Sequence, residues 1–405
     1  MRTRRQRTDA AFFTMGTRRD EESMKKIRLG MIGVGSRGGW FVRNKFMPTR
    51  YNQYATSKQF ELVSVVEPSD DWLEKAFPDG MGDVRRETDW KKMVASDDLD
   101  VICVMTPDHL HEEMAWASFR AGKHVFCEKP LALTPAGCLR VIRAAKKARR
   151  QLVIGFVLRY APVYVKMKQL IDRGTIGKLC GCWMLHSVAS ASDFYFHDWH
   201  AVSKYANSLL LQKGSHDLDI INWIVGAKPV RVGAFGARQY FGGKMPNTLT
   251  CPTCRLKRTC PEFQTGPRVQ CAFRREIDVN DNHTVVVRYA NDVLASYNEC
   301  HFTPDDNREF TFIGTEGKLY LNGAAGTIRV ERRHGKGPVE EHRVRATGGH
   351  GGGDERLLED LARCVRGKGA PVAGPDAGYV SILVAEGAAR SIREGRMIDL
   401  TKGAK

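Results

Sequence analysis

The stretch KIRLGMIGVGSRG, residues 26–38, decides the fold. Its apolar first part predicts a buried strand, which runs directly into three glycines with the spacing G-x-G-x-x-G. Gly33 suits a tight turn, Gly35 lets the backbone approach a pyrophosphate, and Gly38 lets the next helix lie against the strand. The loop residues predicted to hold a dinucleotide are Gly33, Gly35, Ser36, Arg37 and Gly38. Because loops with three glycines are common, the residues that follow have to support this prediction.

Those residues keep one rhythm, in which strand-like runs alternate with helical patterns. The further strand-like runs are FELVSVVE (60–67), DLDVICVMTP (98–107), KHVFCEKP (123–130) and QLVIGFVL (151–158). The helical pattern over 134–150 begins at Thr134 as an N-cap, with Pro135 at the first helical position. Strands and helices that alternate at this spacing predict right-handed βαβ units. Residues 25–153 are therefore expected to form a Rossmann domain, which is a doubly wound parallel sheet.

Past this point the strand-like runs follow one another without a helix between each pair. They predict an α+β domain over 154–405 with a mostly antiparallel open sheet. A helix over SLLLQKGSHDLDIINWIVG (208–226) is expected to cover one face, and VSILVAEGAARSIREGR (380–396) predicts a C-terminal helix. Residues 1–24 lack periodicity and are expected to be a disordered leader or the artefact of an upstream start, with Met24 as the alternative beginning. The predicted fold class is α/β.

Charge and composition limit the function classes. No window reaches the roughly 18 apolar residues that a spanning helix needs, so no membrane contact is predicted and a cytoplasmic protein is expected. The 405 residues carry a formal net charge of +17, which would suit a nucleic-acid ligand. The basic residues are spread along the chain, however, and the densest run, 140–150, is typical of a solvated helix face. The nucleic-acid alternative predicts salt-dependent binding.

The end of the second predicted strand indicates which dinucleotide binds. Glu67 stands there, and its carboxylate can accept hydrogen bonds from both ribose hydroxyls of an adenosine. It lies further from the glycines than the usual spacing of about 20 residues, so we infer an insertion between them. The segment Pro68–Asp71 offers no arginine for a 2′-phosphate. NAD is therefore favoured over NADP.

The stretch TPDHLHEEMAWASFRAGKHVFCEKPLAL, residues 106–133, resembles the signature of the Gfo/Idh/MocA family of glucose-fructose oxidoreductases and inositol dehydrogenases. The resemblance implies oxidation of a sugar or cyclitol hydroxyl by NAD(P). It further implies that Lys129 holds the reacting oxygen, that Pro130, often cis in this family, directs this lysine, and that His216 accepts the hydroxyl proton. The matching residues expected on the cofactor side are Thr106, Pro107, His111, Glu128 and Lys129.

The chemistry of these two side chains is consistent with that role. A neutral imidazole can take the proton that must leave when a carbinol loses hydride, and a fixed ammonium stabilises the developing alkoxide. The sequence departs from the family at Gln212, where many members carry an aspartate; Lys213 and Asp219 are the candidates to supply the missing polar contacts. This departure keeps an alternative open. In it NAD is reduced and reoxidised within one turnover, and the net reaction is elimination, epimerisation or glycoside cleavage.

Further polar residues are candidate substrate contacts. Arg159 and Tyr160 follow the fifth predicted strand, and the run DFYFHDWH (193–200) has stacking aromatics among polar groups. A loop that only covers the sheet would explain this run equally well. The substrate-side predictions are Arg159, Tyr160, His197, Asp198, His200, Gln212, Lys213 and His216, with Asp193 in the same loop. His350 and Asp354 lie in a glycine-rich segment that we expect to close over the site.

The segment CPTCRLKRTCPEFQTGPRVQC contains four clustered cysteines. A C-x-x-C pair followed by two further cysteines is typical of a structural zinc site, here within a predicted insertion over 247–275. An iron–sulfur cluster and free or disulfide-bonded thiols are the alternatives. The predicted ligands are Cys251, Cys254, Cys260 and Cys271. The other cysteines are interpreted as small buried hydrophobes, namely Cys103, Cys127, Cys138, Cys180, Cys182, Cys300 and Cys364. A homo-oligomer, dimer or tetramer, is expected because an open sheet commonly pairs with another subunit.

Overall fold

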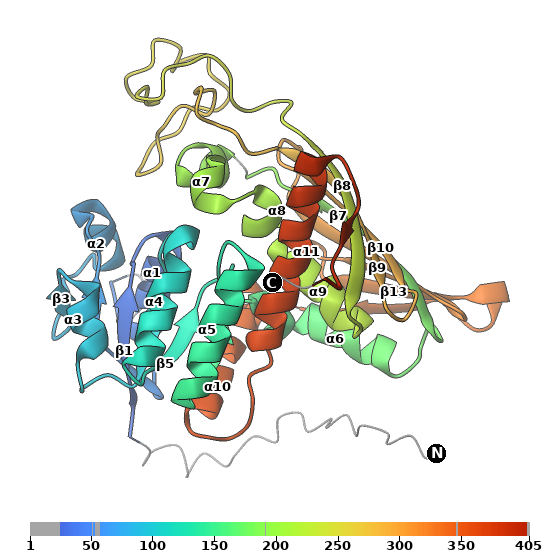
Figure 1. Cartoon of the computed structure of the whole chain (residues 1–405), viewed down its shortest axis with the longest axis horizontal. Coiled ribbons are helices and arrows are strands. Elements are labelled where there is room, and N and C mark those ends of the chain that lie inside the picture. The colour runs from blue at the N-terminus through green and yellow to red at the C-terminus, as the bar shows by residue number, and fades with distance from the viewer. Residues whose placement is uncertain (1–24, 51, 53–56, 191, 346, 403–405) are drawn as a thin grey trace.

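The computed structural model describes residues 25–50, 52, 57–190, 192–345 and 347–402, so the predicted leader lies outside the described residues. The chain builds two sheets that lie side by side (Figure 1). The blue-to-teal half holds a parallel sheet with its helices, and the half that runs from green through yellow to orange holds a larger sheet. One cluster of buried apolar side chains extends through both halves. The predicted α/β fold class is confirmed.

The N-terminal sheet has six parallel strands in the order β3-β2-β1-β4-β5-β6. Their bounds are β1 (Ile27–Ile32), β2 (Phe60–Val66), β3 (Arg85–Glu87), β4 (Val101–Val104), β5 (His124–Cys127) and β6 (Leu152–Ile154). The connecting helices are α1 (Ser36–Phe41), α2 (Asp70–Ala76), α3 (Trp90–Ala95), α4 (Asp108–Arg120) and α5 (Pro135–Ala148), and a π-helical turn, Val42–Phe46, follows α1. The strand order reverses between β1 and β4, and ligands of such sheets bind at the carboxyl ends there.

In the N-terminal half the sequence predicted a helix cap correctly but missed one strand. Thr134 caps α5 as predicted, since its hydroxyl accepts a hydrogen bond from the Gly137 amide at 3.0 Å. Strand β3 was not predicted, because its sequence Arg-Arg-Glu is short and contains no apolar residue. Only pairing with β2 makes it a strand.

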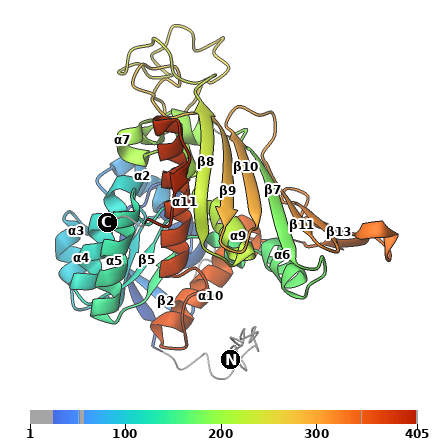
Figure 2. The same ribbon diagram turned by 45° about the vertical axis from the view of Figure 1, so that its right-hand side comes forward.

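The C-terminal sheet has nine strands in the order β14-β13-β12-β11-β7-β10-β9-β8-β15. Figure 2 shows β8, β9, β10 and β7 side by side. Their bounds are β7 (Leu179–Ser187), β8 (Pro229–Ala237), β9 (Asn282–Tyr289), β10 (Leu294–Cys300), β11 (Asn307–Gly314), β12 (Gly317–Asn322), β13 (Thr327–Arg332), β14 (Glu340–Arg343) and β15 (Ile398–Asp399). The β7 and β10 pair is parallel, and the other pairs among the described strands are antiparallel. The predicted mostly antiparallel sheet is therefore confirmed.

The helix predicted over 208–226 is broken into two, which corrects the sequence prediction. The pieces are α8 (Leu209–Gln212) and α9 (Ser215–Val225). The break falls at Gly214, where an added Cβ would lie 2.7 Å from the Leu210 carbonyl oxygen, so the chain turns too tightly for a side chain. The last carbonyl of α8, that of Gln212, consequently faces away from α9 and accepts a bond from elsewhere.

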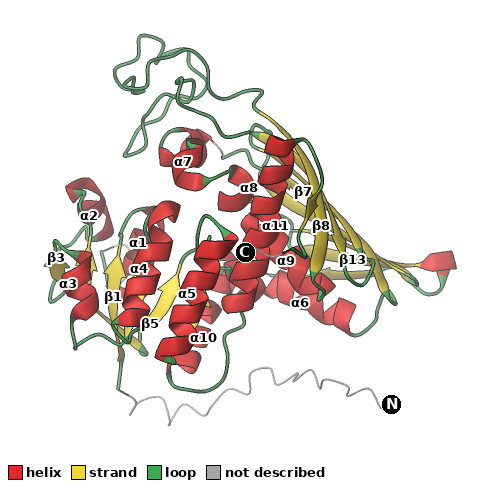
Figure 3. Ribbon diagram, viewed as in Figure 1, coloured by secondary structure: helices red, strands yellow, loops and turns green. Residues whose placement is uncertain are grey.

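The remaining helices are α6 (Pro162–Asp172), the short α7 (Ser203–Ala206), α10 (Gly353–Val365) and α11 (Pro375–Glu394). Helix α11 packs against β8, α9 and α5, and thus joins the two halves. Between β8 and β9 a long excursion, drawn as loop at the top of Figure 3, carries the clustered cysteines.

The prediction that the other cysteines are buried is wrong for Cys180, which is exposed, and for Cys300, which is partly exposed. Cys300 lies on the solvent side of the pleat, since its neighbour Glu299 is buried. Cys180 shares a face with the buried Cys182 but is exposed because it lies at the beginning of β7.

Candidate active site

A cleft of about 990 Å³ lies between the two halves, at the carboxyl ends of β1, β2, β4 and β5. Residues from both halves line it. The sequence-predicted residues that line the cleft are Gly33, Gly35, Ser36, Arg37, Glu67, Thr106, Pro107, His111, Glu128, Lys129, Asp198, His200, Gln212, Lys213, His216 and His350. Segments far apart in the sequence are thus brought to one place.

The glycine loop has the geometry that its spacing predicts. Gly33 has φ +90°, and a Cβ on Gly38 would lie 2.2 Å from the Gly33 carbonyl oxygen. A Cβ on Gly35 would meet no atom within 4 Å, so this backbone faces open space in the cleft. Gly38 itself packs helix on strand and does not line the cleft. The residues present therefore fit the pyrophosphate of a dinucleotide.

Glu67 lies at the end of β2 and is largely buried. Its two carboxylate oxygens accept hydrogen bonds from the backbone amides of Val34 at 2.9 Å and Ser69 at 3.0 Å. These bonds hold the carboxylate beside the glycine loop and leave the second lone pair of each oxygen free. The position suits a ribose that stands next to the pyrophosphate.

Arg37 connects the glycine loop to two distant carboxylates. Its guanidinium donates to Glu128 at 2.7 Å and to Asp354 at 2.5 Å, and it lies over the Phe41 ring. Although burial of Asp354 opposes ionisation, hydrogen bonds from His350 and Arg37 lower the pKa of Asp354 to about 2. The glycine-rich segment before α10 is thereby held at the edge of the cleft, and Glu128 serves to position Arg37.

His111 forms part of the cleft wall and has a supporting role there. It is fully buried, and its ring nitrogens lie 2.7 Å from the Pro130 carbonyl oxygen and 2.8 Å from that of Thr106. A neutral imidazole donates to one of these carbonyls only, and burial lowers the pKa of His111. Because both nitrogens are occupied by backbone, His111 fixes the turn that carries Lys129 and offers no free nitrogen to a cofactor.

Lys129 follows β5 and points across the cleft to the second half. Its ammonium donates to the Gln212 carbonyl oxygen that the break after α8 leaves available, and the Lys129–Pro130 peptide is cis. The Gln212 side chain is also buried, and its Oε1 has no hydrogen-bond partner. The cleft therefore contains one ammonium held by a carbonyl and one amide oxygen without a partner.

His216, in the first turn of α9, is the second central group. Burial, together with the positive charges of Lys129 and Arg308, lowers the pKa of His216 well below its usual value. Its imidazole is therefore neutral at physiological pH and able to accept a proton. The ring lies edge-on to Phe156 at 6.0 Å, and its Nδ1 is buried without a partner.

The substrate side of the cleft is crossed by an arginine that the sequence did not single out. Arg268, from the excursion with the clustered cysteines, pairs with Asp198 at 2.7 Å and donates to the Ser36 hydroxyl at 3.0 Å. Asp198 also accepts from His200. The long loop thus reaches back to the glycine loop and closes one side of the cleft.

Two more positive groups surround His216. Burial lowers the pKa of Lys213 to about 8, with Arg308 adding to the effect, and its ammonium lies 5.3 Å from the Tyr195 ring centroid. Arg308, on β11, pairs with Asp217 at 2.7 Å. Cleft residues that sequence reasoning missed are Asp108, Tyr195, Trp199, Arg268 and Arg308. Tyr195 and Trp199 lie in the aromatic run 193–200 but were not named individually. No local pattern marks Arg268 and Arg308, which reach the cleft through a loop and a strand register, and Asp108 begins α4.

Several predicted substrate residues do not line the cleft. Arg159 forms a two-pronged ion pair with Asp219 at 2.7 and 2.8 Å, so Asp219 does not replace the missing aspartate either. The Tyr160 hydroxyl donates to the buried Asp360 at 2.8 Å. His197 bonds the Gln270 carbonyl, and Asp193 bonds Gln264. These side chains hold the structure together around the cleft.

Comparison with known proteins agrees with this geometry. Residues 27–156 match the description "Oxidoreductase family, NAD-binding Rossmann fold", and residues 168–400 match "Oxidoreductase family, C-terminal alpha/beta domain". The chain belongs to the Gfo/Idh/MocA oxidoreductase family. The family resemblance seen in residues 106–133 is therefore confirmed, and the N-terminal half is an NAD(P)-binding Rossmann domain.

Individual relatives of this family member are distant. YteT of Bacillus subtilis is 28% identical over 349 residues, which cover 74% of this chain and 81% of that protein. Inositol 2-dehydrogenase 2 of Saccharopolyspora erythraea is 31% identical over 214 residues, 53% of this chain and 58% of the relative. The solved structure of a levoglucosan dehydrogenase with NADH and levoglucosan superimposes with a TM-score of 0.73 at 20% identity, covering 93% of this chain and 100% of that one. This last likeness shows the fold alone.

Two wider findings concern the rest of the chain. No described helix combines the length and the apolar character needed to cross a membrane. All eleven cysteines lie in the described residues and are free thiols. Backbone amides donate to two of the clustered sulfurs, from Leu256 to Cys254 and from Phe273 to Cys271, both at 3.4 Å.

Proposed function

We propose that this oxidoreductase removes hydride from a secondary hydroxyl of a sugar, sugar derivative or inositol, with NAD as the acceptor. One observation carries the proposal. Lys129 and His216, which come from different halves of the chain, line the same cleft as the glycine loop. A cationic donor and a neutral base at one hydroxyl are what oxidation of a carbinol requires. The similarity to an inositol dehydrogenase and to a levoglucosan dehydrogenase supports the substrate class.

Within this proposal each residue has a separate task. NAD, when bound, supplies the hydride acceptor, and Gly33, Gly35 and Glu67 would hold it. His216 accepts the hydroxyl proton: its lowered pKa keeps the ring neutral and so free to accept, and also makes it a weaker base. Lys129 donates to the same oxygen and exchanges its bond to the Gln212 carbonyl for one to substrate. The neighbouring positive charge opposes protonation of His216, so the proton must pass on to solvent or to another base.

NAD is proposed over NADP because Glu67 stands at the ribose position. The structure adds an arginine that the sequence argument did not consider. Arg86, on β3, lines the cleft near Glu67, but it already pairs with Asp70 at 2.6 Å. We therefore expect a kcat/KM with NAD above that with NADP. Equal or reversed values would assign Arg86 to a 2′-phosphate.

The test is formation of NADH from a panel of inositols, aldoses and anhydrosugars. Lys129→Ala is expected to lower kcat by about 10²–10³-fold or more, since it removes a preorganised donor at the developing oxyanion. The affinity for NAD, measured by calorimetry, should stay within about threefold, because the glycine loop is intact. Lys147→Ala, an exposed lysine on α5, is the matched control. Wild-type turnover in Lys129→Ala would refute the assignment.

A second candidate function keeps the same oxidation but makes it transient. The observation that favours it is the unpartnered Oε1 of Gln212, at the position where the family resemblance leads us to expect an aspartate. The net reaction would then be elimination, epimerisation or glycoside cleavage. Turnover of a glycoside without accumulation of NADH supports this candidate, whereas stoichiometric NADH supports the first.

We further propose that Cys251, Cys254, Cys260 and Cys271 bind a structural zinc ion. Amide bonds to Cys254 and Cys271 and the lysines and arginines of the loop would stabilise metal-bound thiolates. Without a metal, burial raises the pKa of Cys251 and Cys271. The described side chains close enough together to share an ion do not include these cysteines, so binding would need the loop to close around the metal. Loss of zinc in Cys254→Ser is the corresponding test.

The outer face of the C-terminal sheet supports a homo-oligomer. Large apolar side chains on adjacent strands are exposed there, among them Phe235 at 83%, Trp183 at 60% and Leu294 at 59%. An exposed apolar patch of this kind marks a protein interface. We propose that two chains pair through this face.

A further inference from the structure

The opposite face of the same sheet carries a row of polar residues behind the turn between α8 and α9. Strand register places Arg308 beside His186, His186 beside Glu299, and Glu299 beside His283. Asp217 of α9 satisfies the first two, accepting from Arg308 at 2.7 Å and from His186 at 2.6 Å. Glu299 Oε2 and His283 Nδ1 have no hydrogen-bond partner among the described residues. This end of the row is therefore satisfied only in part.

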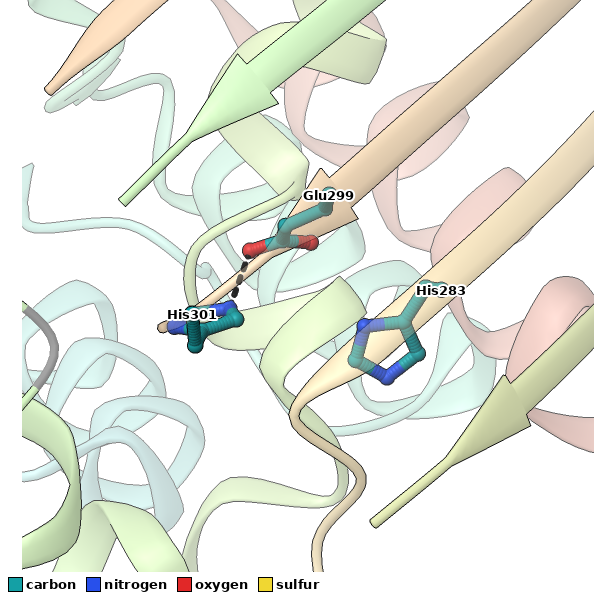
Figure 4. A group of neighbouring side chains, drawn as sticks. All are labelled: His283, Glu299 and His301. Atoms are coloured by element: carbon teal, nitrogen blue, oxygen red, sulfur yellow. Dashed lines mark hydrogen bonds and ion pairs between the residues drawn. The ribbon is translucent and has the colours of Figure 1, made fainter. Parts of the chain in front are cut away.

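A third side chain joins them. His301 follows β10 two residues after Glu299, and a period of two places both on the same face. Figure 4 shows His283, Glu299 and His301 around one point, and their ligand atoms all lie within 4.8 Å of one another. Glu299 and His301 are 0% exposed and His283 is 2% exposed.

Each of the three retains an unsatisfied atom. Glu299 Oε2, His283 Nδ1 and His301 Nδ1 are buried without a hydrogen-bond partner. Leaving one such atom unsatisfied costs about 1–3 kcal/mol, so Glu299 Oε2 and His283 Nδ1 in one group require an explanation. His301 faces Glu299 through Nε2, and its Nδ1 lies on the other side of the ring. The single hydrogen bond within the group joins His301 Nε2 to Glu299 Oε1 at 2.7 Å.

We propose that His283, Glu299 and His301 bind one divalent first-row transition ion, with zinc as its representative. Two imidazoles and one carboxylate form a familiar donor set for such ions. Zinc at about 2.0–2.2 Å from each ligand would place the ligand atoms roughly 3.3 Å apart. The present spacing is within about 1.5 Å of that value, so side-chain rotation closes the site. The ion replaces the proton now shared by His301 and Glu299.

The surroundings favour a structural ion over a catalytic one. The rings of Tyr195 and Phe196 lie edge-on to His301 at 5.3 and 6.1 Å, which keeps water away on that side. The three ligands do not line the cleft, and none belongs to the cysteine cluster. A Cβ on Gly214 would lie 3.0 Å from Glu299 Oε2, so the ion would brace the turn that carries Lys213.

Metal content of the full chain tests the proposal. Wild type, Glu299→Gln, His283→Gln and Cys254→Ser are purified identically and measured by inductively coupled plasma mass spectrometry, with His342→Gln as the control. His342 is a histidine on β14 of the same sheet that lies near a glutamate but outside the group. Glu299→Gln and His283→Gln should each lack one ion per chain that His342→Gln and Cys254→Ser retain. Their zinc affinity, measured after chelation, should fall by at least about tenfold.

A second measurement covers variants that fail to fold. Cobalt added to metal-free Cys254→Ser should give the ligand-field bands of a nitrogen and oxygen site without the thiolate charge-transfer band. Equal ion content in wild type, Glu299→Gln and His283→Gln would overturn the proposal. The absence of cobalt bands in Cys254→Ser would overturn it as well, and would assign the group to a metal-free hydrogen-bonded network.

Discussion

The variant Tyr160→Phe tests whether the hydroxyl of this tyrosine stabilises the fold or contacts the substrate, as its position in the sequence suggested. The hydroxyl donates to Asp360 at 2.8 Å and accepts from the Ala373 amide at 3.1 Å. Asp360 and Ala373 are both buried. The bond ties the turn after β6 to α10 and to the segment that precedes α11. Removing the Tyr160 hydroxyl oxygen therefore weakens contacts between the two halves of the chain and leaves the residues that line the cleft unchanged.

The expected cost follows from these two bonds. A hydrogen bond to a charged group contributes about 1.5–3 kcal/mol, and an unsatisfied buried amide costs about 1–3 kcal/mol. Asp360 keeps its bonds from Arg363 and from the Val372 amide, which limits the loss. We expect the free energy of unfolding to fall by about 3 kcal/mol, and Tm by roughly 4 °C for a chain of 405 residues.

The assay combines thermal unfolding with steady-state kinetics on the best substrate of the panel. Tyr379→Phe is the matched control, because no hydrogen bond is found for its hydroxyl among the described residues. In Tyr160→Phe, kcat/KM should stay within about twofold below the unfolding range, since no transition-state contact is removed. An unchanged Tm together with a kcat/KM lowered about tenfold or more would refute this reasoning and restore Tyr160 to the substrate site.

Three further outcomes are expected. Arg268→Gln should raise the Kd for NAD by roughly 10-fold, because it removes the charged link between Asp198 and the glycine loop, and unchanged calorimetric affinity would contradict this. Asp354→Asn should lower Tm at neutral pH. Because the pKa of Asp354 is lower in the folded than in the unfolded chain, its ionised carboxylate stabilises the fold by roughly 2 kcal/mol above about pH 4, and this stabilisation is lost toward pH 2. The Tm difference between variant and wild type should therefore shrink on acidification. Phe235→Glu should shift the chain to a monomer in light scattering at unchanged near-ultraviolet circular dichroism, and an unaltered mass would exclude this face as the interface.

The sequence alone predicted what depends on neighbours along the chain. The glycine spacing, the alternation of strands and helices, the cap at Thr134 and the stretch 106–133 each rest on contacts within a few residues. They were sufficient for the fold class, the family and the identity of Lys129 and His216 as cleft residues. Strand β3 was not predicted, because it forms only by pairing with β2. The break at Gly214 was not predicted either, because it follows from a steric limit on the turn that the local pattern does not show.

Tertiary structure alone decided what depends on contacts between distant segments. Glu128 could not be assigned from its neighbours, yet the structure uses it to hold Arg37, which in turn holds Asp354. Arg268 enters the cleft only because a loop folds back over it. The group of His283, Glu299 and His301 exists because two strands pair in one register, and a shift by one residue would turn each side chain to the other face.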